Sequence, residues 1–367
     1  MMFLKACIEV FLLCVSCVSY AQTGVRERVV FYNTENLFDT RNDTLTADDD
    51  FTPRGKQHWN RERYTRKLLN ISKVLSSLGA GNFPLLIGLS EVENRGVVSD
   101  LVNKTVLADG NYGIVHADSP DARGIDVALL YRKDSFRLLH NAFFPVRLKS
   151  GETTRDILYC EGISAPNDTL HVFVCHFPSM RGGEAKSEWK RVKAASVVRQ
   201  KVDSIQDLHP RAMILILGDL NGRANTPAQK MLKTQDPESG TIKSENFYNT
   251  GYYLLGKNYG SYRYKGEWQT LDHIIVSGNL LNGKADLQVS RRMGIYDADF
   301  LLEEERGTFG VRPKPTYRGP HYIGGYSDHL PVFIDLKKEL LFLKIKDYFC
   351  GKIHRTRYGR LSSTVLI

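Results

Sequence analysis

The chain has 367 residues and a formal net charge of +9, and 42% of its residues are apolar. This apolar content excludes an intrinsically disordered chain, and 30 glycines without a regular repeat exclude a collagen-like protein. The length fits two domains of ordinary size or one large α/β or sandwich domain.

The N-terminus has the pattern of a secretory signal peptide. Lys5 precedes an apolar stretch that is too short to span a bilayer, and a small-x-small sequence ends at Ala21. We therefore predict that residues 1–21 are a cleaved leader and that the protein is exported to the periplasm, the cell surface or the extracellular space. The alternatives are a buried N-terminal helix and a lipid anchor on Cys14 or Cys17, neither of which follows a good small-residue box.

Seven apolar runs of strand length follow along the chain, each bounded by turn residues. They cover residues 28–33, 84–90, 125–131, 170–176, 213–218, 271–276 and 331–336. Helical spacing lies between them: Tyr64 and Leu68 share one face of a predicted helix over 64–78, and a second long helix is predicted over 184–208. Alternating strands and helices, with hairpins in the region 125–176, predict an α/β protein in which helices cover a pair of mixed sheets.

Three long stretches rich in glycine, asparagine and aspartate are predicted to be loops, at residues 39–57, 234–266 and 304–327. Long loops in compact domains are often functional. Near the end of the second stretch, Arg263 and Trp268 could hold a substrate, but a packed aromatic hairpin is the favoured interpretation.

Three cysteines remain after removal of the leader, namely Cys160, Cys175 and Cys350. The first two lie in strand-like runs joined by a turn at Asn167 and Asp168, and counted outward from this turn they fall opposite each other. Export would permit a disulfide between Cys160 and Cys175, and two buried free thiols are the alternative.

The C-terminal residues 337–367 carry eight basic and two acidic residues, a net charge of +6. A solvated tail is the favoured interpretation, and a basic helix that lies on a membrane surface is the alternative. The rest of the chain has a net charge of +3, to which the leader contributes nothing because Lys5 offsets Glu9. A central region this close to neutrality lacks the broad basic surface of a dedicated duplex-DNA binder.

Many of the predicted strands end in carboxylate, amide or imidazole side chains. Carboxylates gathered at strand ends repel one another unless a cation lies among them. Oxygen ligands without thiolates suit Mg²⁺, Mn²⁺ or Ca²⁺ rather than Zn²⁺. The residues that offer such oxygens are Asn33, Glu35, Glu91, Asp219, Asn221, Asp272 and Asp328.

The histidines near the same strand ends suit the hydrolysis of a phosphoester. His329, held by a carboxylate such as Asp272, could stabilise the charge that develops on a phosphorane. Asp219 could accept a proton from the attacking water, and a metal ion would polarise the phosphate oxygen.

Six short motifs carry these residues, in the order Tyr32-Asn-Thr-Glu-Asn-Leu-Phe-Asp39, Ser90-Glu91, Val174-Cys-His-Phe-Pro-Ser179, Gly218-Asp-Leu-Asn221, Leu271-Asp-His-Ile274 and Ser327-Asp-His-Leu-Pro331. Each motif alone is weak, but the six in this order are specific. Together they resemble the endonuclease/exonuclease/phosphatase superfamily. Its members include pancreatic deoxyribonuclease, abasic-site nucleases of the exonuclease III type, neutral sphingomyelinases and inositol-polyphosphate 5-phosphatases.

The resemblance implies a fold like that of pancreatic deoxyribonuclease, a four-layer α/β sandwich of two packed mixed sheets flanked by helices. The corresponding domain would occupy residues 22–336. The resemblance also implies that Glu91 is the main metal ligand, that Asn33 and Glu35 lie at the first metal and phosphate position, and that Asp328 completes the metal and histidine environment.

The remaining site residues are implied in the same way. Asp219 would act as the base, Asp272 would pair with His329, and His176 would contact the scissile phosphate. The other implied substrate contacts are Ser179, Asn221 and Arg123, the last of which could instead form a salt bridge within its turn.

The sequence thus predicts an exported, Mg²⁺-dependent phosphoester hydrolase, with Mn²⁺ or Ca²⁺ as other candidate ions. A phosphodiesterase that acts on nucleic acid is preferred, and a phosphatase or a sphingomyelinase-like phosphodiesterase is the alternative within the same fold. A non-catalytic surface-binding module is the alternative from another class, although all the acids and both histidines of the motifs are present. We expect a monomer.

Overall fold

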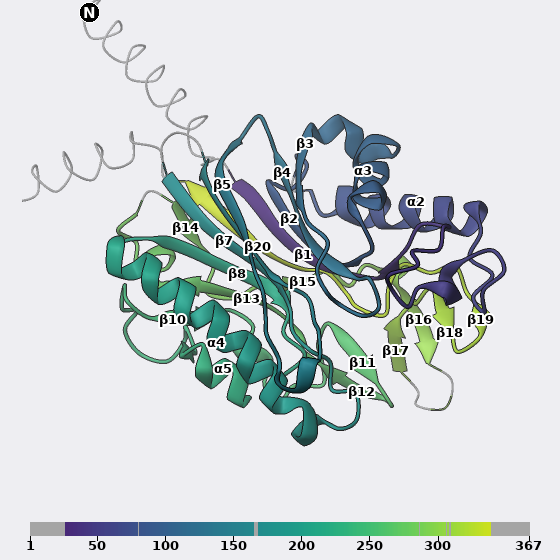
Figure 1. Cartoon of the computed structure of the whole chain (residues 1–367). Helices are drawn as coiled ribbons and strands as arrows, with labels where there is room; N and C mark the ends of the chain where they lie inside the picture. The colour runs from purple at the N-terminus through teal and green to yellow at the C-terminus, as the bar shows by residue number, and fades with distance from the viewer. Residues whose placement is uncertain are drawn as a thin grey trace, which may run out of the picture.

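The computed structural model describes residues 26–338, apart from residues 80, 165–167, 286, 306, 308 and 309. In this part of the chain, two mixed sheets of seven strands each pack face to face, and helices cover their outer faces (Figure 1). This is the four-layer α/β sandwich that the sequence predicted. The predicted leader, most of the predicted tail and Cys350 lie outside the described residues, so the interpretations of these segments stay predictions.

The first sheet contains β1 (Arg26–Leu37), β2 (Leu86–Val92), β3 (Tyr112–His116), β4 (Asp126–Arg132), β14 (Leu287–Val289), β15 (Gly294–Ile295) and β20 (Val332–Lys338). Its strand order is β14-β20-β1-β2-β4-β3, and β15 also pairs with β20. β1 and β2 run parallel, whereas the other pairs are antiparallel.

The second sheet contains β5 (Phe136–Phe144), β6 (Ile157–Ser164), β7 (Asp168–His176), β8 (Met213–Asp219), β9 (Thr234–Gln235), β10 (Phe247–Asn249) and β13 (Asp272–Ser277). Its strand order is β5-β6-β7-β8-β13-β10-β9. The pairs β7–β8 and β9–β10 are parallel, and the rest are antiparallel.

The α-helices of the described residues are α2 (Arg61–Ser77), α3 (Arg95–Asn103), α4 (Glu184–Leu208) and α5 (Pro227–Met231). Asn60 precedes α2, and its side chain caps the helix by accepting a hydrogen bond from the Arg63 amide. α2 and α3 pack on the first sheet, and α4 packs on the second, where Val198 lies in one apolar cluster with Ile216 of β8. No helix among these residues has both the length and the hydropathy of a membrane span.

Short elements connect the layers. The small hairpins are β11 (Tyr262–Tyr264) with β12 (Glu267–Gln269), β16 (Leu302–Glu305) with β17 (Gly310–Pro313), and β18 (Tyr317–Arg318) with β19 (His321–Tyr322). Single 3₁₀ turns are η1 (Asp49–Phe51), η2 (Val106–Gly110), η3 (Lys149–Gly151), η4 (Tyr252–Leu254), η5 (Gly278–Leu280) and η6 (Asp299–Leu301).

Strand β8 shows why the core could be predicted from the sequence. Leu217 packs between the two sheets, close to Val174 and Gly88, and a Cβ atom on Gly88 would lie 3.4 Å from Leu217 Cδ1. Ile216 belongs to the cluster on the opposite face of the sheet, under α4. Because both faces of β8 are buried, the strand is a continuous apolar run rather than an alternating one.

Replacing Leu217 by alanine should lower the free energy of unfolding by about 2–5 kcal/mol, because it leaves a cavity at a fully buried position between the sheets. Urea unfolding followed by circular dichroism measures this loss. Leu208, which is 76% exposed at the end of α4, provides the control. Leu208→Ala should change the free energy by less than about 0.5 kcal/mol, and equal losses in the two variants would contradict the prediction.

The predicted elements form, and the structure adds others that the sequence did not predict. The seven predicted strands correspond to β1, β2, β4, β7, β8, β13 and β20, and the second predicted helix has the bounds of α4. β5 was missed because it is an edge strand with mostly exposed or half-exposed residues, and α3 and β3 were missed as well. The predicted loops are also partly wrong, since two of them contain short strands.

The favoured aromatic hairpin is present as β11 and β12. The guanidinium of Arg263 lies over the Trp268 ring, 5.5 Å from its centroid, and forms an ion pair of 2.7 Å with Glu305. Because Arg263 is held by these two side chains, its contribution is to the packing of the hairpin.

The register of β6 and β7 corrects the expected position of the two cysteines. Cys160 pairs with Val172, so it is not opposite Cys175, and both cysteines are buried free thiols. The expected register was wrong because Asp168 belongs to the strand, where it pairs with Ser164, and not to the turn. The resulting shift of three residues also puts the cysteines on opposite faces of the sheet, in different apolar clusters.

Both thiols should resist alkylation in the folded protein. Burial raises the pKa of Cys160 to about 12 and raises that of Cys175 further, so neither forms a reactive thiolate at neutral pH. Peptide mapping after iodoacetamide treatment should find both residues unmodified in the native protein and both modified in urea, without any reductant. If modification in urea needs a reductant, a disulfide exists and the prediction is wrong.

Candidate active site

Polar side chains from neighbouring strands meet at one edge of the sandwich. In the second sheet, Asp219 at the end of β8 pairs on one side with His176 of β7 and on the other with Asp272 of β13. In the first sheet, Asn33 of β1 pairs with Ser90 of β2. Since directly paired residues lie about 5 Å apart in a sheet, the strand register alone brings these groups together.

The backbone is irregular where the first sheet contributes its polar groups. The register between β1 and β2 shifts after Asn33, and the register between β2 and β4 shifts after Ser90. Glu35 and Glu91 have positive φ angles of 53° and 60°, and Asn221 beyond the end of β8 has a φ of 48°. Bulges and left-handed backbone redirect side chains and are common at functional sites, so the strand ends are shaped to present these residues.

His329 and Asp272 form the most direct contact in this group. His329 Nδ1 lies 2.7 Å from Asp272 Oδ2, and His329 Nε2 lies 3.8 Å from Asp219 Oδ2. The hydroxyl of Ser327 accepts a hydrogen bond from the backbone N–H of His329 and donates one to the carbonyl of Asn33. The imidazole is therefore oriented by one carboxylate and directed at another.

A second histidine approaches the same carboxylate. His176 Nε2 lies 3.6 Å from Asp219 Oδ2 and 3.9 Å from Glu91 Oε1. The amide of Asn33 donates a hydrogen bond of 3.1 Å to Asp219 Oδ2, and Glu91 Oε2 accepts one of 3.0 Å from the Asn36 N–H. Asp219 Oδ2 is thus the centre of the cluster.

The surroundings of the two histidines shift their pKa values in opposite directions. Burial by itself would lower the pKa of His329, but the carboxylates of Asp272, Asp328 and Asp219 outweigh it and hold this pKa well above its usual value. Burial lowers the pKa of His176 well below its usual value, and positive charge from two arginines adds to the effect. Such a split pair supplies one charged donor and one neutral imidazole.

Burial raises the pKa of Asp219 to about 7. Burial also raises the pKa of Asp328, and the negative charge of Glu91 adds to this effect, whereas the charge of His329 opposes it. Asp272 Oδ1 is buried without a hydrogen-bond partner. The ligand atoms of Asp219, Asp272 and His329 lie within 4.8 Å of one another. Carboxylates crowded in this way fit a divalent cation bound close by.

Glu35 lies beside other partners. Its Oε2 accepts hydrogen bonds from the amide and the hydroxyl of Thr316, and it lies 3.6 Å from Lys67 Nζ. Burial raises the pKa of Glu35 to about 7, although the charge of Lys67 opposes this. One carboxylate oxygen is therefore committed to Thr316 and Lys67, and the role of Glu35 as a metal ligand stays a prediction.

Arg123, the arginine expected at the site, is less firmly held than Arg155, which the sequence analysis did not identify. Arg123 is partly exposed, and its Nε lies 3.8 Å from Asp121 Oδ1. The buried Arg155 forms an ion pair of 2.9 Å with Asp121 and donates hydrogen bonds to the carbonyls of His176 and Phe177. Arg155 therefore fixes the segment that follows β7, whereas Arg123 keeps a guanidinium accessible to solvent.

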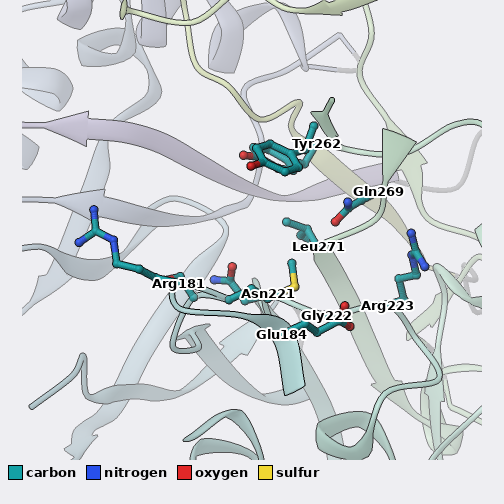
Figure 2. A pocket seen from close by; sticks show the side chains of 11 residues that line it. Arg181, Glu184, Asn221, Gly222, Arg223, Tyr262, Gln269 and Leu271 are labelled. Atoms are coloured by element: carbon teal, nitrogen blue, oxygen red, sulfur yellow. The ribbon is translucent and has the colours of Figure 1, made fainter. Parts of the chain in front are cut away.

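A cavity of about 720 Å³ opens beside this cluster. Ser179 and Asn221 line it on the side of the polar cluster, and the Asn221 side chain donates a hydrogen bond to the carbonyl of Phe177. Arg181 and Arg223 lie on opposite sides, with Asn221 and Leu271 between them (Figure 2). The cavity thus combines cationic, amide and apolar walls.

The sequence comparison assigns this arrangement to a family. The sequence model described as the Endonuclease/Exonuclease/phosphatase family matches residues 28–338. The chain belongs to this family. It is accordingly a metal-dependent hydrolase of phosphoester bonds, and its acidic group fits the divalent metal on which enzymes of this family depend.

Solved structures of other family members share the fold. A family protein from Bacteroides thetaiotaomicron has a TM-score of 0.53 and 16% identity, with 87% of this chain and 97% of that chain covered. D. rerio TDP2 complexed with a single-strand DNA product has a TM-score of 0.52 and 15% identity, with 85% and 99% covered. The human Nocturnin catalytic domain has a TM-score of 0.51 and 18% identity, with 86% and 97% covered. No curated protein sequence matches this chain significantly.

Two further residues lie at this site, and only one of them had a signal in the sequence. Lys67 lies on the apolar face of α2 next to Leu68 and is buried, where it donates hydrogen bonds to Thr316 and to the Tyr326 carbonyl. A lysine within an apolar helix face indicates a buried partner. The Tyr262 ring lies against the His329 ring, with centroids 4.8 Å apart and planes tilted by 35°, and only the tertiary structure brings this residue of β11 there.

Proposed function

We propose that this chain is an exported phosphodiesterase that cleaves nucleic acid with Mg²⁺ as its metal ion. The observation that carries the substrate class is the cavity of about 720 Å³ beside Asn221, with Tyr262 and Tyr264 in its lining together with Arg181 and Arg223. Tyrosine rings can stack on bases and arginines can pair with neighbouring phosphates. TDP2, which shares the fold, has been solved with a single-strand DNA product, and this supports the same class.

The proposed chemistry assigns one task to each central side chain. Asp219 accepts the proton of the attacking water, and its raised pKa suits a base that works near neutral pH. Protonated His329, whose Nδ1 donates a hydrogen bond to Asp272 Oδ2, donates through Nε2 to the phosphoryl oxygen on which charge develops. His176 and Ser179 contact the scissile phosphate, and Asn221 holds the phosphate or the water.

The oxygen atoms of Glu91, Asn33 and Asp328 are the proposed metal ligands. Mg²⁺ bound there would polarise the phosphoryl oxygen and neutralise part of its charge. Glu91 contributes most, because its Oε1 faces the cluster while Oε2 is anchored by the Asn36 amide. Mn²⁺ and Ca²⁺ are the other candidate ions for this oxygen-rich set.

A phosphatase is the second candidate within the family. A mannosyl-6-phosphatase from Bacteroides thetaiotaomicron shares the fold, with a TM-score of 0.51 and 16% identity, and with 84% of this chain and 99% of that chain covered. A cavity with Gln269 and Glu184 in its lining could also hold the hydroxyls of a sugar. The two candidates differ in whether the phosphorus carries one ester or two.

A substrate panel separates these candidates. The mature protein should be assayed with Mg²⁺ on single-stranded and plasmid DNA, RNA, sphingomyelin, inositol phosphates and a sugar phosphate. We expect cleavage of nucleic acid, with phosphate esters of sugars and lipids turned over at least tenfold less efficiently. Preferred turnover of a monoester would overturn the nucleic-acid proposal in favour of a phosphatase, and no turnover of any member would favour the non-catalytic binding module.

Substitution of Arg223 tests whether the cavity binds the substrate. Arg223→Ala should raise the KM for an oligonucleotide about tenfold, since a charge-assisted hydrogen bond contributes roughly 1.5 kcal/mol. Its KM for a small phosphodiester that does not reach the cavity should be unchanged. Arg147→Ala is the control, because Arg147 is exposed and lines a different cavity. An unchanged KM for the oligonucleotide would remove the cavity from the substrate path.

Export rests on the N-terminal pattern and has its own test. Expression of the full chain with its leader should release a protein whose N-terminal sequencing starts at Gln22. Recovery of the uncleaved chain from the cytosol would contradict export, and a lipid-modified Cys14 or Cys17 would replace the soluble form by a lipoprotein.

A further inference from the structure

The hairpin of β3 and β4 brings three potential metal ligands to one face of the sheet. His116 is the last residue of β3 and pairs with Ala128 of β4. Asp126, the first residue of β4, lies two positions before Ala128, and Asp118 lies two residues beyond His116 in the segment that follows β3. Since every second residue of a strand lies on the same face, His116 and Asp126 point to the same side, and the distance of 3.9 Å from His116 Nδ1 to Asp118 Oδ1 places Asp118 beside them. We refer to these three residues as the hairpin cluster.

The hairpin cluster is compact enough to close around one ion, which would bind through one of the two imidazole nitrogens of His116. His116 Nε2 lies 3.5 Å from Asp126 Oδ2, and His116 Nδ1 lies 3.9 Å from Asp118 Oδ1. One ligand atom from each residue lies within 4.8 Å of the others. Asp126 is already oriented, because its Oδ1 accepts a hydrogen bond of 2.9 Å from the Ser119 N–H.

Buried polar atoms beside the hairpin cluster lack partners. The His116 side chain is only 1% exposed, yet its Nε2 has no hydrogen-bond partner although it faces Asp126. The hydroxyl oxygens of Ser119 and Thr46 are buried without partners as well. Buried polar groups are almost always satisfied, so a bound ion or a water molecule is expected beside these atoms.

The adjoining cavity has an excess of negative charge. It measures about 490 Å³, and its lining includes five carboxylates but no lysine, arginine or histidine. Arg155 and Arg123 both approach Asp121, at 2.9 Å and 3.8 Å, and so neutralise that carboxylate. The carboxylates left without such a partner in the lining include Asp118 and Asp126. The electrostatics therefore favour a cation at the hairpin cluster.

We propose that His116, Asp118 and Asp126 bind a divalent transition-metal ion, with Zn²⁺ or Mn²⁺ as the chemical class. An imidazole nitrogen with two carboxylates suits these ions, whereas Mg²⁺ and Ca²⁺ prefer oxygen ligands alone. Water would complete the coordination on the side of the cavity. This site is separate from the oxygen-rich group around Glu91.

Metal binding here would close a loop that adjoins the active site. The ligands lie at the two ends of residues 117–125, the segment that joins β3 to β4. This segment carries Asp121 and Arg123, and Asp121 holds Arg155, which in turn fixes the carbonyl of His176. An ion that joins His116 to Asp126 would therefore restrict the loop and stabilise the position of Asp121.

Zn²⁺ titration of three variants by isothermal calorimetry tests the proposal. Asp118→Asn replaces a charged carboxylate ligand by a weaker, neutral amide at a position that is 82% exposed, so the fold should be preserved. Asp109→Asn is the matched control, because Asp109 is exposed in the 3₁₀ turn before β3 and is outside the hairpin cluster. Glu91→Gln reports separately on the metal site proposed for catalysis.

We expect Asp118→Asn to lose one equivalent of bound Zn²⁺, or to bind it at least tenfold more weakly, whereas Asp109→Asn behaves like the wild type. Zn²⁺ should raise the thermal midpoint of Asp109→Asn more than that of Asp118→Asn, because only the first keeps the site. Glu91→Gln should keep the equivalent that Asp118→Asn loses. Identical Zn²⁺ stoichiometry and affinity in the Asp118 and Asp109 variants would overturn the proposal.

Discussion

The His329→Ala variant is expected to lose about 10²- to 10⁴-fold in kcat, the range attributed to one positioned acid–base group. The structure gives the reason: the imidazole is held at 2.7 Å by Asp272 and is directed at Asp219, and the surrounding carboxylates keep it protonated. Alanine removes both the donor and the positive charge at the point where charge develops on the phosphoryl group. KM should change much less, because the substrate contacts of the cavity remain.

Steady-state kinetics of purified variants on the best substrate of the panel measure this loss. His321→Ala is the control, since His321 is exposed on β19 and should leave kcat within about twofold of wild type. Circular dichroism and the thermal midpoint establish that both variants fold. If His329→Ala and His321→Ala have the same kcat, His329 is not a catalytic residue and the proposed chemistry fails.

Asp272→Asn tests whether the charge of Asp272, and not only its position beside His329, contributes to catalysis. The amide keeps the size of the carboxylate but loses the charge that raises the pKa of His329. The variant should therefore have a lower kcat than wild type, and its activity should fall at a lower pH as pH rises, because His329 deprotonates earlier. An unchanged pH profile would mean that Asp272 has only a structural role.

Glu91→Gln should weaken binding of the catalytic metal by at least 10- to 100-fold and lower activity at subsaturating Mg²⁺ accordingly. A neutral amide removes the negative charge at Oε1, which faces His176 and the rest of the cluster. The amide oxygen can still accept the hydrogen bond from Asn36. The loop should therefore keep its shape, and the effect should come from the metal.

Two measurements check this second result. The Mg²⁺ dependence of the rate gives the apparent affinity, and Mn²⁺ titration by calorimetry gives binding without turnover. Glu62→Gln on the exposed face of α2 is the control and should bind both ions like the wild type. Unchanged Mn²⁺ affinity in Glu91→Gln would show that Glu91 is not a ligand, and saturating Mg²⁺ that restores full activity would confine its role to binding.

The elements that sequence reasoning predicted are those whose side chains face one environment along their whole length. β8 is apolar throughout because it lies between the other sheet and α4, so its end at Asp219 could be placed without a structure. β5 could not, because an edge strand with exposed positions has no such pattern. The positions of Asp219 and Asp272 at the ends of predicted strands were therefore readable.

The register between β6 and β7 was not predicted correctly from the local sequence. Counting from an assumed turn set Cys160 opposite Cys175, but the pairing of Ser164 with Asp168 moves the partner of Cys160 to Val172. The expected and the observed register both pair apolar residues with apolar residues, since this part of the sheet is buried on both faces. The choice between them depends on packing against neighbouring strands, which a turn signal does not contain.

By itself, the sequence determined the family, the alternation of strands and helices, and the residue types at the strand ends, because each of these follows from local composition and order. The tertiary structure decided which of these groups touch. Lys67 meets Thr316 across 249 positions of the chain, and Arg155 joins the β3–β4 loop to the segment after β7. Contacts of this kind are created when separate elements pack together, and the charge, orientation and metal affinity of the site depend on them.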